Sequence, residues 1–175
     1  MTFDLVPVTE ETPLLQPVLQ SLAKMYCYEW SQYNGIEVNE QGDFPFEKYV
    51  PTYWQTPERK AFLFRISGEA GARWAGFALL DKDFNLAPPA DHSMAEFFVM
   101  HHYRRAGLGK WAALELFRRY PGEWELGRNP KNLGSVPFWD RVISEATGGD
   151  FMLKCSALEH RYPDGTLGDI FRFRV

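Results

Sequence analysis

The spacing of apolar residues along the chain separates strand-like from helix-like segments. Strands are predicted where short apolar stretches alternate or cluster between turn residues. These stretches lie at residues 3–8, 60–67, 73–81, 93–100, 123–127, 151–161 and 166–175. Helices are predicted where apolar residues recur at steps of three and four. These segments lie at residues 12–34, 108–120 and 135–146.

Capping and breaking residues set the limits of the first helix. Thr12 precedes Pro13, and this pair predicts the start of the helix, because a threonine hydroxyl caps the first turn and proline suits the first helical position. Asn34-Gly35 predicts its end.

The chain between residues 35 and 57 is irregular, acidic and aromatic. It predicts a short second helix around residues 46–54, although Pro51 interrupts the pattern. Further along, residues 68–71 predict a hairpin turn slightly longer than two residues, and Gly148-Gly149 predicts the end of the last helix.

The most informative segment runs from Ala95 to Lys110, where an apolar strand leads into a basic turn with two glycines, directly before a helix. This order predicts a row of free backbone N–H groups at a helix N-terminus, a place where an anion such as a pyrophosphate binds. Gly107 and Gly109 allow positive φ and close approach to a ligand. Arg104 and Arg105 add positive charge, as does Lys110.

Two common nucleotide loops fit this segment poorly. A phosphate loop of nucleoside triphosphatases would need a Lys-Ser/Thr pair and wider glycine spacing. The run Gly107 to Ala112 matches the dinucleotide pattern G-x-G-x-x-A, with Glu125 downstream. However, residues 101–106 separate strand from glycine, and too little chain follows for a second nucleotide-binding half. A structural turn without a ligand is the simplest alternative.

Two motifs resemble those of the GCN5-related N-acetyltransferases (GNAT). Arg104-x-x-Gly107-x-Gly109 is similar to their acetyl-CoA loop, Arg/Gln-x-x-Gly-x-Gly/Ala, and residues 132–139 are similar to their second box, Asn-x-x-Ala/Ser-x-x-Phe/Leu-Tyr. Within the superfamily, residues 96–100 followed by Tyr103-Arg104 resemble the diamine acetyltransferases. The resemblance covers the middle and C-terminal half well, and the first 90 residues only by pattern.

The resemblance implies an α/β (α+β) fold in a single domain over residues 1–175. Its sheet would be mixed, mostly antiparallel and seven-stranded, flanked by about four helices and split open around the strand at residues 93–100.

The resemblance also implies acetyl-CoA as co-substrate, without a metal. Backbone groups of the strand before the loop would bind the pantetheine arm, and one N–H would polarise the thioester carbonyl. Main-chain N–H groups of the loop would hold the pyrophosphate, and two residues after the next strand would contact the far end of the arm. The implied cofactor-binding residues are Phe97, Phe98, Val99, Arg104, Arg105, Ala106, Gly107, Leu108, Gly109, Lys110, Asn132 and Ser135.

Glu96 is the candidate catalytic residue. An alkylammonium with a pKa near 10 must lose a proton before it attacks a thioester, so a base is needed. Glu96 matches an acidic position of the diamine enzymes beside the acetyl group, whereas Ala95 stands where those enzymes have a second acid. The alternative for Glu96 is an exposed or salt-bridged carboxylate.

Trp139 stands where the family usually has the tyrosine that protonates the departing thiolate. An indole N–H is no acid at useful pH. Either another group or water donates the proton, or the thiolate leaves unaided. Trp139 is otherwise a core residue beside Phe138.

The acidic, aromatic stretch after the first helix lies where the family builds its acceptor pocket. Carboxylates and ring faces attract cations, which favours a primary amine of a small molecule, such as a polyamine, an amino sugar or a lysine-like side chain. The alternative is a solvated loop whose aromatics pack on the first helix. His101 and His102 are predicted on the loop surface.

The predicted function is therefore an acetyl-CoA-dependent N-acetyltransferase that transfers the acetyl group directly in a ternary complex. A non-catalytic acyl-CoA-binding or sensing module is the competing class, and a nicotinamide-binding oxidoreductase is a more distant one.

Composition narrows the partners. The chain has 175 residues, 45% of them hydrophobic, and a net charge of -4, which suits one domain with a core and disfavours nucleic acid. No run of 18 apolar residues and no signal peptide is seen, so we expect no membrane partner and a cytoplasmic protein. Cys27 and Cys155 lack metal or disulfide spacing and are predicted as reduced, buried thiols. The resemblance also allows a homodimer.

Overall fold

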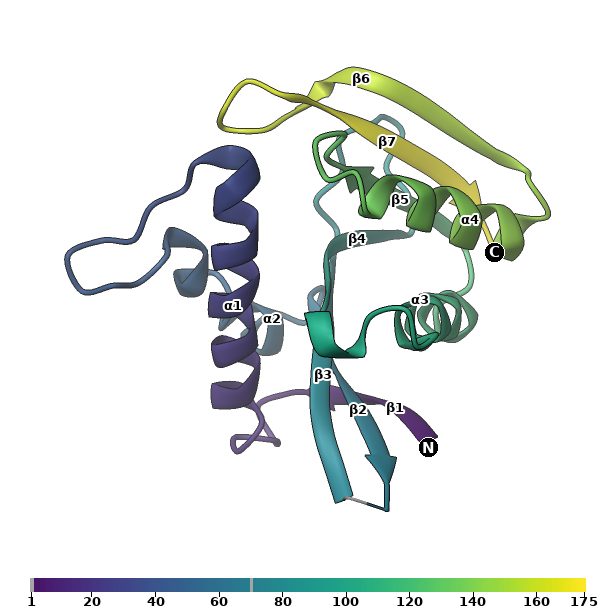
Figure 1. Cartoon of the computed structure of the whole chain (residues 1–175). Helices are drawn as coiled ribbons and strands as arrows, with labels where there is room; N and C mark the ends of the chain where they lie inside the picture. Colours follow the sequence, from purple (N-terminus) through teal and green to yellow (C-terminus); the bar gives the residue numbers. More distant parts are fainter. Residues whose placement is uncertain (1, 70) are drawn as a thin grey trace.

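The computed structural model describes residues 2–69 and 71–175. Within them the chain forms one seven-stranded sheet, four α-helices and two short 3-10 turns. The strands are β1 (Thr2–Val8), β2 (Lys60–Gly68), β3 (Gly71–Asp81), β4 (His92–Val99), β5 (Glu123–Arg128), β6 (Phe151–Arg161) and β7 (Leu167–Arg174). The helices are α1 (Gln16–Asn34), α2 (Thr52–Gln55), α3 (Leu108–Arg119) and α4 (Ser135–Thr147), and the 3-10 turns are η1 (Pro45–Lys48) and η2 (His101–Tyr103) (Figure 1).

The strands follow the order β1-β2-β3-β4-β5-β7-β6, and every neighbouring pair is antiparallel except β4 and β5. The predicted mixed, mostly antiparallel sheet is therefore confirmed, as is the number of helices.

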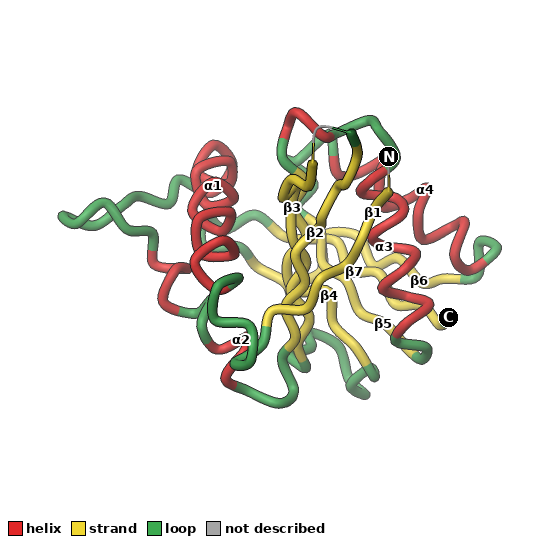
Figure 2. The backbone as a smooth tube through the Cα atoms, turned by 90° about the horizontal axis from the view of Figure 1, so that it is seen from below, coloured by secondary structure: helices red, strands yellow, loops and turns green. Residues whose placement is uncertain are grey.

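The helices cover the two faces of the sheet (Figure 2). On one face α1 and α2 pack on β2 and β3, with Leu19, Tyr53, Leu63 and Phe77 among the buried residues. On the other face α3 and α4 pack in a second cluster that includes Trp124. Each side is held by the apolar stripe of its helices and by alternate residues of the strands.

The sheet opens at its centre. The parallel pairing of β4 with β5 covers only His92 to Met94 opposite Trp124 to Leu126. At the same level the register between β4 and β3 shifts by one residue. Met94 lies opposite Leu80, and Glu96, two residues later, lies opposite the adjacent Leu79. Ala95 is thus the extra residue of a β-bulge, and beyond it β4 stays paired with β3 alone.

The first helix begins later than Thr12 predicted. The Thr12 hydroxyl accepts a hydrogen bond from the Thr9 N–H at 2.8 Å and closes a separate turn, so it caps no helix. The helix begins at Gln16, with Pro17 in its first turn. Its end is as predicted, because Gly35 takes a left-handed conformation with φ of 66°.

Two further expectations are corrected, and a third lies partly outside the described residues. The helix expected around residues 46–54 is two short pieces, η1 and α2, because Pro51 has no N–H to continue the first. The strands of the first hairpin extend to Gly68 and Gly71, which face each other, and the expected turn includes residue 70, outside the described residues. Cys27 is buried as expected, but Cys155 is exposed, because it lies on the edge strand β6.

Candidate active site

Glu96 lies on the α1 side of the sheet because of the bulge at Ala95. Met94 and its partner Leu80 belong to the core under α3 and α4. Two residues further along an unbroken strand, Glu96 would point the same way. The extra residue reverses this direction, and Glu96 instead faces the cluster that contains Leu79 and α1.

The Glu96 carboxylate contacts a tyrosine of α1. The hydroxyl of Tyr26 donates a short hydrogen bond to Oε2 of Glu96. Burial raises the pKa of Glu96 to about 7, the Tyr26 hydrogen bond lowers it, and the charge of Asp81 raises it. Glu96 forms no ion pair within the described part of the chain. The alternative of a salt-bridged or fully exposed carboxylate is therefore contradicted, and a carboxyl group poised near neutral pH is a good general base.

Tyr162, in the turn between β6 and β7, also lies beside this group. Its ring stacks on Trp30 of α1, with ring centroids 5.7 Å apart, and it contacts His160 edge-on. Burial and then the charge of Glu96 raise the pKa of Tyr162. Tyr26, Trp30 and Tyr162 were not predicted as site residues, because only the fold brings the β6–β7 turn to the end of α1.

The backbone of β4 beyond the bulge has one edge turned away from β3. The Met100 N–H donates to the Ala75 carbonyl, so Met100 and, two residues earlier, Phe98 direct their main-chain groups toward β3. Phe97 and Val99 direct theirs to the opposite side, where β5 has diverged. Of the three residues expected to bind the pantetheine arm, Phe97 and Val99 have backbone groups facing the open edge, whereas those of Phe98 face β3.

The basic turn has the backbone form expected of an anion site. Arg105 has φ of 62° and Gly107 has φ of 85°, and Gly107 is the N-cap of α3. The first helical N–H groups, from Leu108 to Lys110, have no acceptor within the helix. Gly109 lies under Val99 and Phe138, where an added Cβ would lie within 3.4 to 3.5 Å of their side chains. These N–H groups and the dipole of α3 suit a pyrophosphate.

The side chains of this turn are partly committed to neighbouring elements. The guanidinium of Arg104 donates to both carboxylate oxygens of Glu29 at 2.6 and 2.7 Å, and to the Val99 carbonyl at 2.7 Å. Lys110 pairs with Glu145 of α4 at 2.7 Å. Arg105 and Ala106 are exposed, as are His101 and His102, the two histidines predicted on the surface.

The second motif forms the start of α4. Asn132 accepts the Ser135 N–H through its side-chain oxygen at 3.2 Å, and the Ser135 hydroxyl donates to the Asn132 carbonyl at 2.9 Å. Both residues are therefore placed at the N-terminus of α4, whose first turns also carry Phe138, a neighbour of Phe97 in β4. Trp139 is 6% exposed and packs edge-on against Phe97 and Phe138, with ring centroids 5.1 and 4.8 Å away. Its surroundings agree with the core alternative.

The acidic, aromatic stretch packs largely on α1. Asp43 and Glu47 both pair with Lys24, at 3.1 and 3.5 Å. Phe44 is buried, and Phe46 lies next to Tyr26 with ring centroids 6.1 Å apart. This stretch therefore behaves as the packed-loop alternative, apart from Phe46, which borders the Glu96 group.

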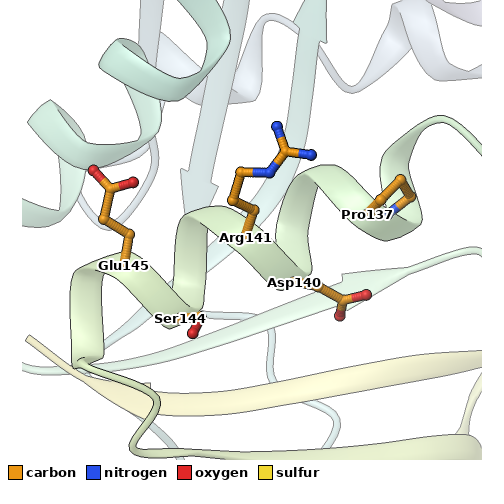
Figure 3. Close-up of a pocket in the computed structure, with 5 residues that line it drawn as sticks. All are labelled: Pro137, Asp140, Arg141, Ser144 and Glu145. Atoms are coloured by element: carbon orange, nitrogen blue, oxygen red, sulfur yellow. The ribbon is translucent and has the colours of Figure 1, made fainter.

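A surface hollow along α4 lies away from Glu96. It is lined by Pro137, Asp140, Arg141, Ser144 and Glu145, with Arg141 and Glu145 pointing to one side of the helix and Asp140 to the other (Figure 3). Asp140 is bound to Arg128 at 2.6 Å and Glu145 to Lys110. The hollow therefore lies among structural ion pairs. Across residues 2–69 and 71–175, no set of His, Cys, Asp and Glu side chains could hold a metal ion, and no helix could cross a membrane.

Solved structures of known proteins share this fold over their whole length. An acetyltransferase from Thermus thermophilus superimposes with a TM-score of 0.64 at 17% identity, covering 100% of this chain and 98% of that one. An acetyltransferase of the GNAT family from Staphylococcus aureus gives 0.61 at 11% identity, with 99% of both chains covered. A putative streptothricin acetyltransferase from Bacillus anthracis, in complex with acetyl coenzyme A, gives 0.58 at 10% identity and covers 100% and 99%.

No protein-family model and no curated protein matches the sequence. The structural likeness nevertheless confirms the expectation from the two motifs: the chain has the fold of the GCN5-related N-acetyltransferases.

Proposed function

We propose that the protein is an acetyl-CoA-dependent N-acetyltransferase that acts on the primary amine of a small molecule. The single observation that carries the proposal is Glu96, a partly buried carboxyl group with a pKa of about 7 on the part of β4 that has an open edge and leads into the basic turn. The fold, shared with a protein bound to acetyl coenzyme A, supports the choice of co-substrate.

The residues of the turn fit a pyrophosphate. N–H groups from Arg105 to Lys110 and the N-terminus of α3 would bind it, with Arg105 supplying an exposed positive charge. Backbone groups of Phe97 and the N–H of Val99, whose carbonyl already binds Arg104, would hydrogen-bond the pantetheine arm. Asn132 and Ser135 at the start of α4 would border its far end. Acetyl-CoA supplies an activated acyl group when bound.

Glu96 would accept a proton from the acceptor ammonium. The neutral nitrogen then attacks the thioester carbonyl carbon, a C–N bond forms, and the nitrogen releases its second proton to water. The C–S bond breaks and the electron pair leaves on sulfur. Both substrates are bound at once, so no acyl group is attached to the protein. A backbone N–H on the open edge of β4 would stabilise the negative charge on the carbonyl oxygen.

The thiolate would leave without a tyrosine acid. Trp139 is buried and has no acidic proton, and the pKa of Tyr162 is raised by burial, so its hydroxyl stays protonated and is a poor acid toward a thiolate. A thiolate of mildly basic pKa can leave unaided and take its proton from water.

The surroundings of Glu96 favour a cationic acceptor. The Glu96 carboxylate accepts a hydrogen bond from Tyr26 and lies close enough to Tyr162 for its charge to raise the pKa of that hydroxyl. Trp30 packs on both tyrosines, and aromatic rings attract an ammonium group through their faces.

The second candidate function is an acyl-CoA-binding module without turnover, which the buried Trp139 favours. A thiol-release assay with acetyl-CoA across polyamines, aminoglycosides, amino acids and peptides separates the two. Release of CoA with any amine supports the enzyme. Acetyl-CoA binding without release on the whole panel supports the binding module, and absence of binding contradicts both.

A further inference from the structure

Tyr26 approaches Glu96 from a rigid setting. Its ring contacts Trp30, Phe46, Phe77 and Phe98, with centroids between 5.6 and 6.1 Å away, and the side chain is 9% exposed. Rings on several sides fix the direction of the hydroxyl, so the hydrogen bond to Oε2 of Glu96 is defined by the core of the protein. The other oxygen, Oε1, accepts no hydrogen bond within the described residues.

We propose that Tyr26 is a positioning residue for the transfer reaction, and that its hydroxyl holds Oε2 of Glu96 so that Oε1 is left to take the proton of the acceptor amine. The inference rests on the proposed role of Glu96 as the base. A carboxylate with one oxygen fixed cannot rotate away from the bound amine, and proton transfer needs this geometry.

The hydroxyl also adjusts the charge of Glu96. A hydrogen bond donated to a carboxylate favours its ionised form, so Tyr26 opposes the effect of burial and of Asp81. Without it, Glu96 would hold its proton to higher pH, and less of the enzyme would be in the basic form at neutral pH.

The other titratable groups around Glu96 stay neutral near pH 7 or are already paired. From α1, burial raises the pKa of Cys27 to about 12, and burial also raises that of Tyr26. The pKa values of Tyr53 from α2 and Tyr162 from the β6–β7 turn are raised as well, mainly by burial. Asp81, at the end of β3, accepts hydrogen bonds from Tyr53 and from the Asp83 N–H. Burial raises the pKa of Asp81 as well, so a change in the acidic limb of activity is assigned to Glu96 when Tyr26→Phe causes it and Tyr53→Phe does not.

The position of Tyr26 in α1 ties the base to the rest of the site. Tyr26, Glu29 and Trp30 are spaced at i, i+3 and i+4 and share one face of the helix. They contact Glu96, Arg104 of the basic turn and Tyr162, respectively. The helix that places the base therefore also contacts the proposed cofactor turn.

The test is the pH dependence of kcat/KM in Tyr26→Phe, which keeps the ring and removes the hydroxyl. The acidic limb should move upward by roughly one pH unit, and kcat at neutral pH should fall about tenfold, while the acetyl-CoA dissociation constant is unchanged. Tyr53→Phe is the matched control, because it removes a buried hydroxyl from a different carboxylate, Asp81. Tyr53→Phe should not move the acidic limb of the kcat/KM profile to higher pH.

A second readout does not depend on turnover. The carboxyl carbon of Glu96, labelled with 13C and identified by its loss in Glu96→Gln, should titrate at higher pH in Tyr26→Phe than in the wild type. An unchanged titration and pH profile in Tyr26→Phe would overturn the inference, and so would equal upward shifts in Tyr26→Phe and Tyr53→Phe. If Glu96→Gln keeps full activity, the role of Glu96 as base fails. If Glu96→Gln loses activity and Tyr26→Phe matches the wild type, the role of Tyr26 alone fails.

Discussion

Arg104 joins Glu29 of α1 to the end of β4, because one guanidinium binds both oxygens of the Glu29 carboxylate and the Val99 carbonyl. Side-chain exposures of 35% and 16% make this pair partly buried, which strengthens it relative to a surface ion pair. The contact fixes the first residue of the basic turn to the helix that carries Tyr26.

The pair predicts a measurable coupling between α1 and the turn. In a double-mutant cycle of Glu29→Gln and Arg104→Gln, urea unfolding should give a coupling energy of about 1 to 2 kcal/mol. The cycle Lys154→Gln with Glu159→Gln, a pair on β6 with side-chain exposures of 44% and 40%, should give less than about 0.5 kcal/mol. Equal coupling in both cycles would contradict a special role for the Arg104 contact.

The turn predicts a specific response to acetyl-CoA. Saturation at 100 times the dissociation constant should raise the free energy of unfolding by about 2.7 kcal/mol and raise Tm accordingly, whereas NAD should cause no shift. Gly107→Val and Gly109→Val should abolish the shift. The first forces a branched residue to φ of 85°, and the second adds two methyl groups beyond a Cβ that would already touch Val99 and Phe138.

Gly42 is the matched control for Gly107. It also has positive φ, 79°, and open space around its Cβ position, but it lies in the stretch after α1. Gly42→Val should lower Tm by a similar amount and keep the acetyl-CoA shift. Loss of the shift in both variants would mean that the effect is general destabilisation.

Glu96→Gln should keep acetyl-CoA binding and lower kcat/KM by roughly 100-fold or more at pH 7. In the wild type kcat/KM should rise with pH through about 7, where Glu96 loses its proton. The deficit of the variant should shrink toward pH 10, because the free amine becomes abundant there. Wild-type activity of Glu96→Gln with its best acceptor at pH 7 would assign deprotonation to solvent.

The same substitution should stabilise the fold at neutral pH. The pKa of Glu96 in the folded protein, about 7, lies above its usual 4.5, so the folded state binds this proton more tightly than the unfolded state. Ionising the buried Glu96 carboxyl lowers the free energy of unfolding. This loss is absent below pH 4.5, grows as pH rises to 7 and is constant above pH 7. Glu96→Gln should therefore raise the free energy of unfolding by about 1 to 3 kcal/mol at pH 8 and by almost nothing at pH 4. Denaturant unfolding at both pH values measures this, and an equal effect at the two would exclude titration as the cause.

Trp139 should behave as a core residue. Trp139→Ala should lower the free energy of unfolding by roughly 3 to 5 kcal/mol, because it leaves a cavity beside Phe97 and Phe138. Trp139→Tyr should fold almost normally and hold or raise turnover. A Trp139→Phe protein of normal stability without activity would show that the indole takes part in the reaction.

The strands were predictable because their alternating or clustered apolar residues face the two cores that cover the sheet. The ends of α1 and α4 were predictable because Gly35 and Gly148 suit a left-handed C-cap. The predicted start of α1 was wrong. Thr12 is a residue type that often caps helices, but its hydroxyl accepts the Thr9 N–H instead. The sequence shows that a residue of the capping type is present. Whether its side chain caps the helix or closes a neighbouring turn depends on competition between the two hydrogen bonds.

The candidate site was predictable only in part. Glu96, Gly107 and Gly109 belong to motifs, and their roles stay predictions, as do the homodimer and the cytoplasmic location. Tyr26 and Tyr162 could not be found from the sequence, because Tyr26 is 70 residues from Glu96 and no short pattern records such a contact. The raised pKa of Glu96 depends on the same long-range packing, so it could not be predicted from the sequence either.

The bulge at Ala95 makes the site depend on the count of residues in β4 more than on their identity. Successive side chains of a strand point to opposite faces of the sheet. Removing one residue between Met94 and Glu96 would therefore move the side chains of whichever part of β4 shifted to the other face. Exchanging Ala95 for another small residue should therefore keep Glu96 on the α1 side of the sheet, whereas a one-residue deletion there would turn its carboxylate toward α3.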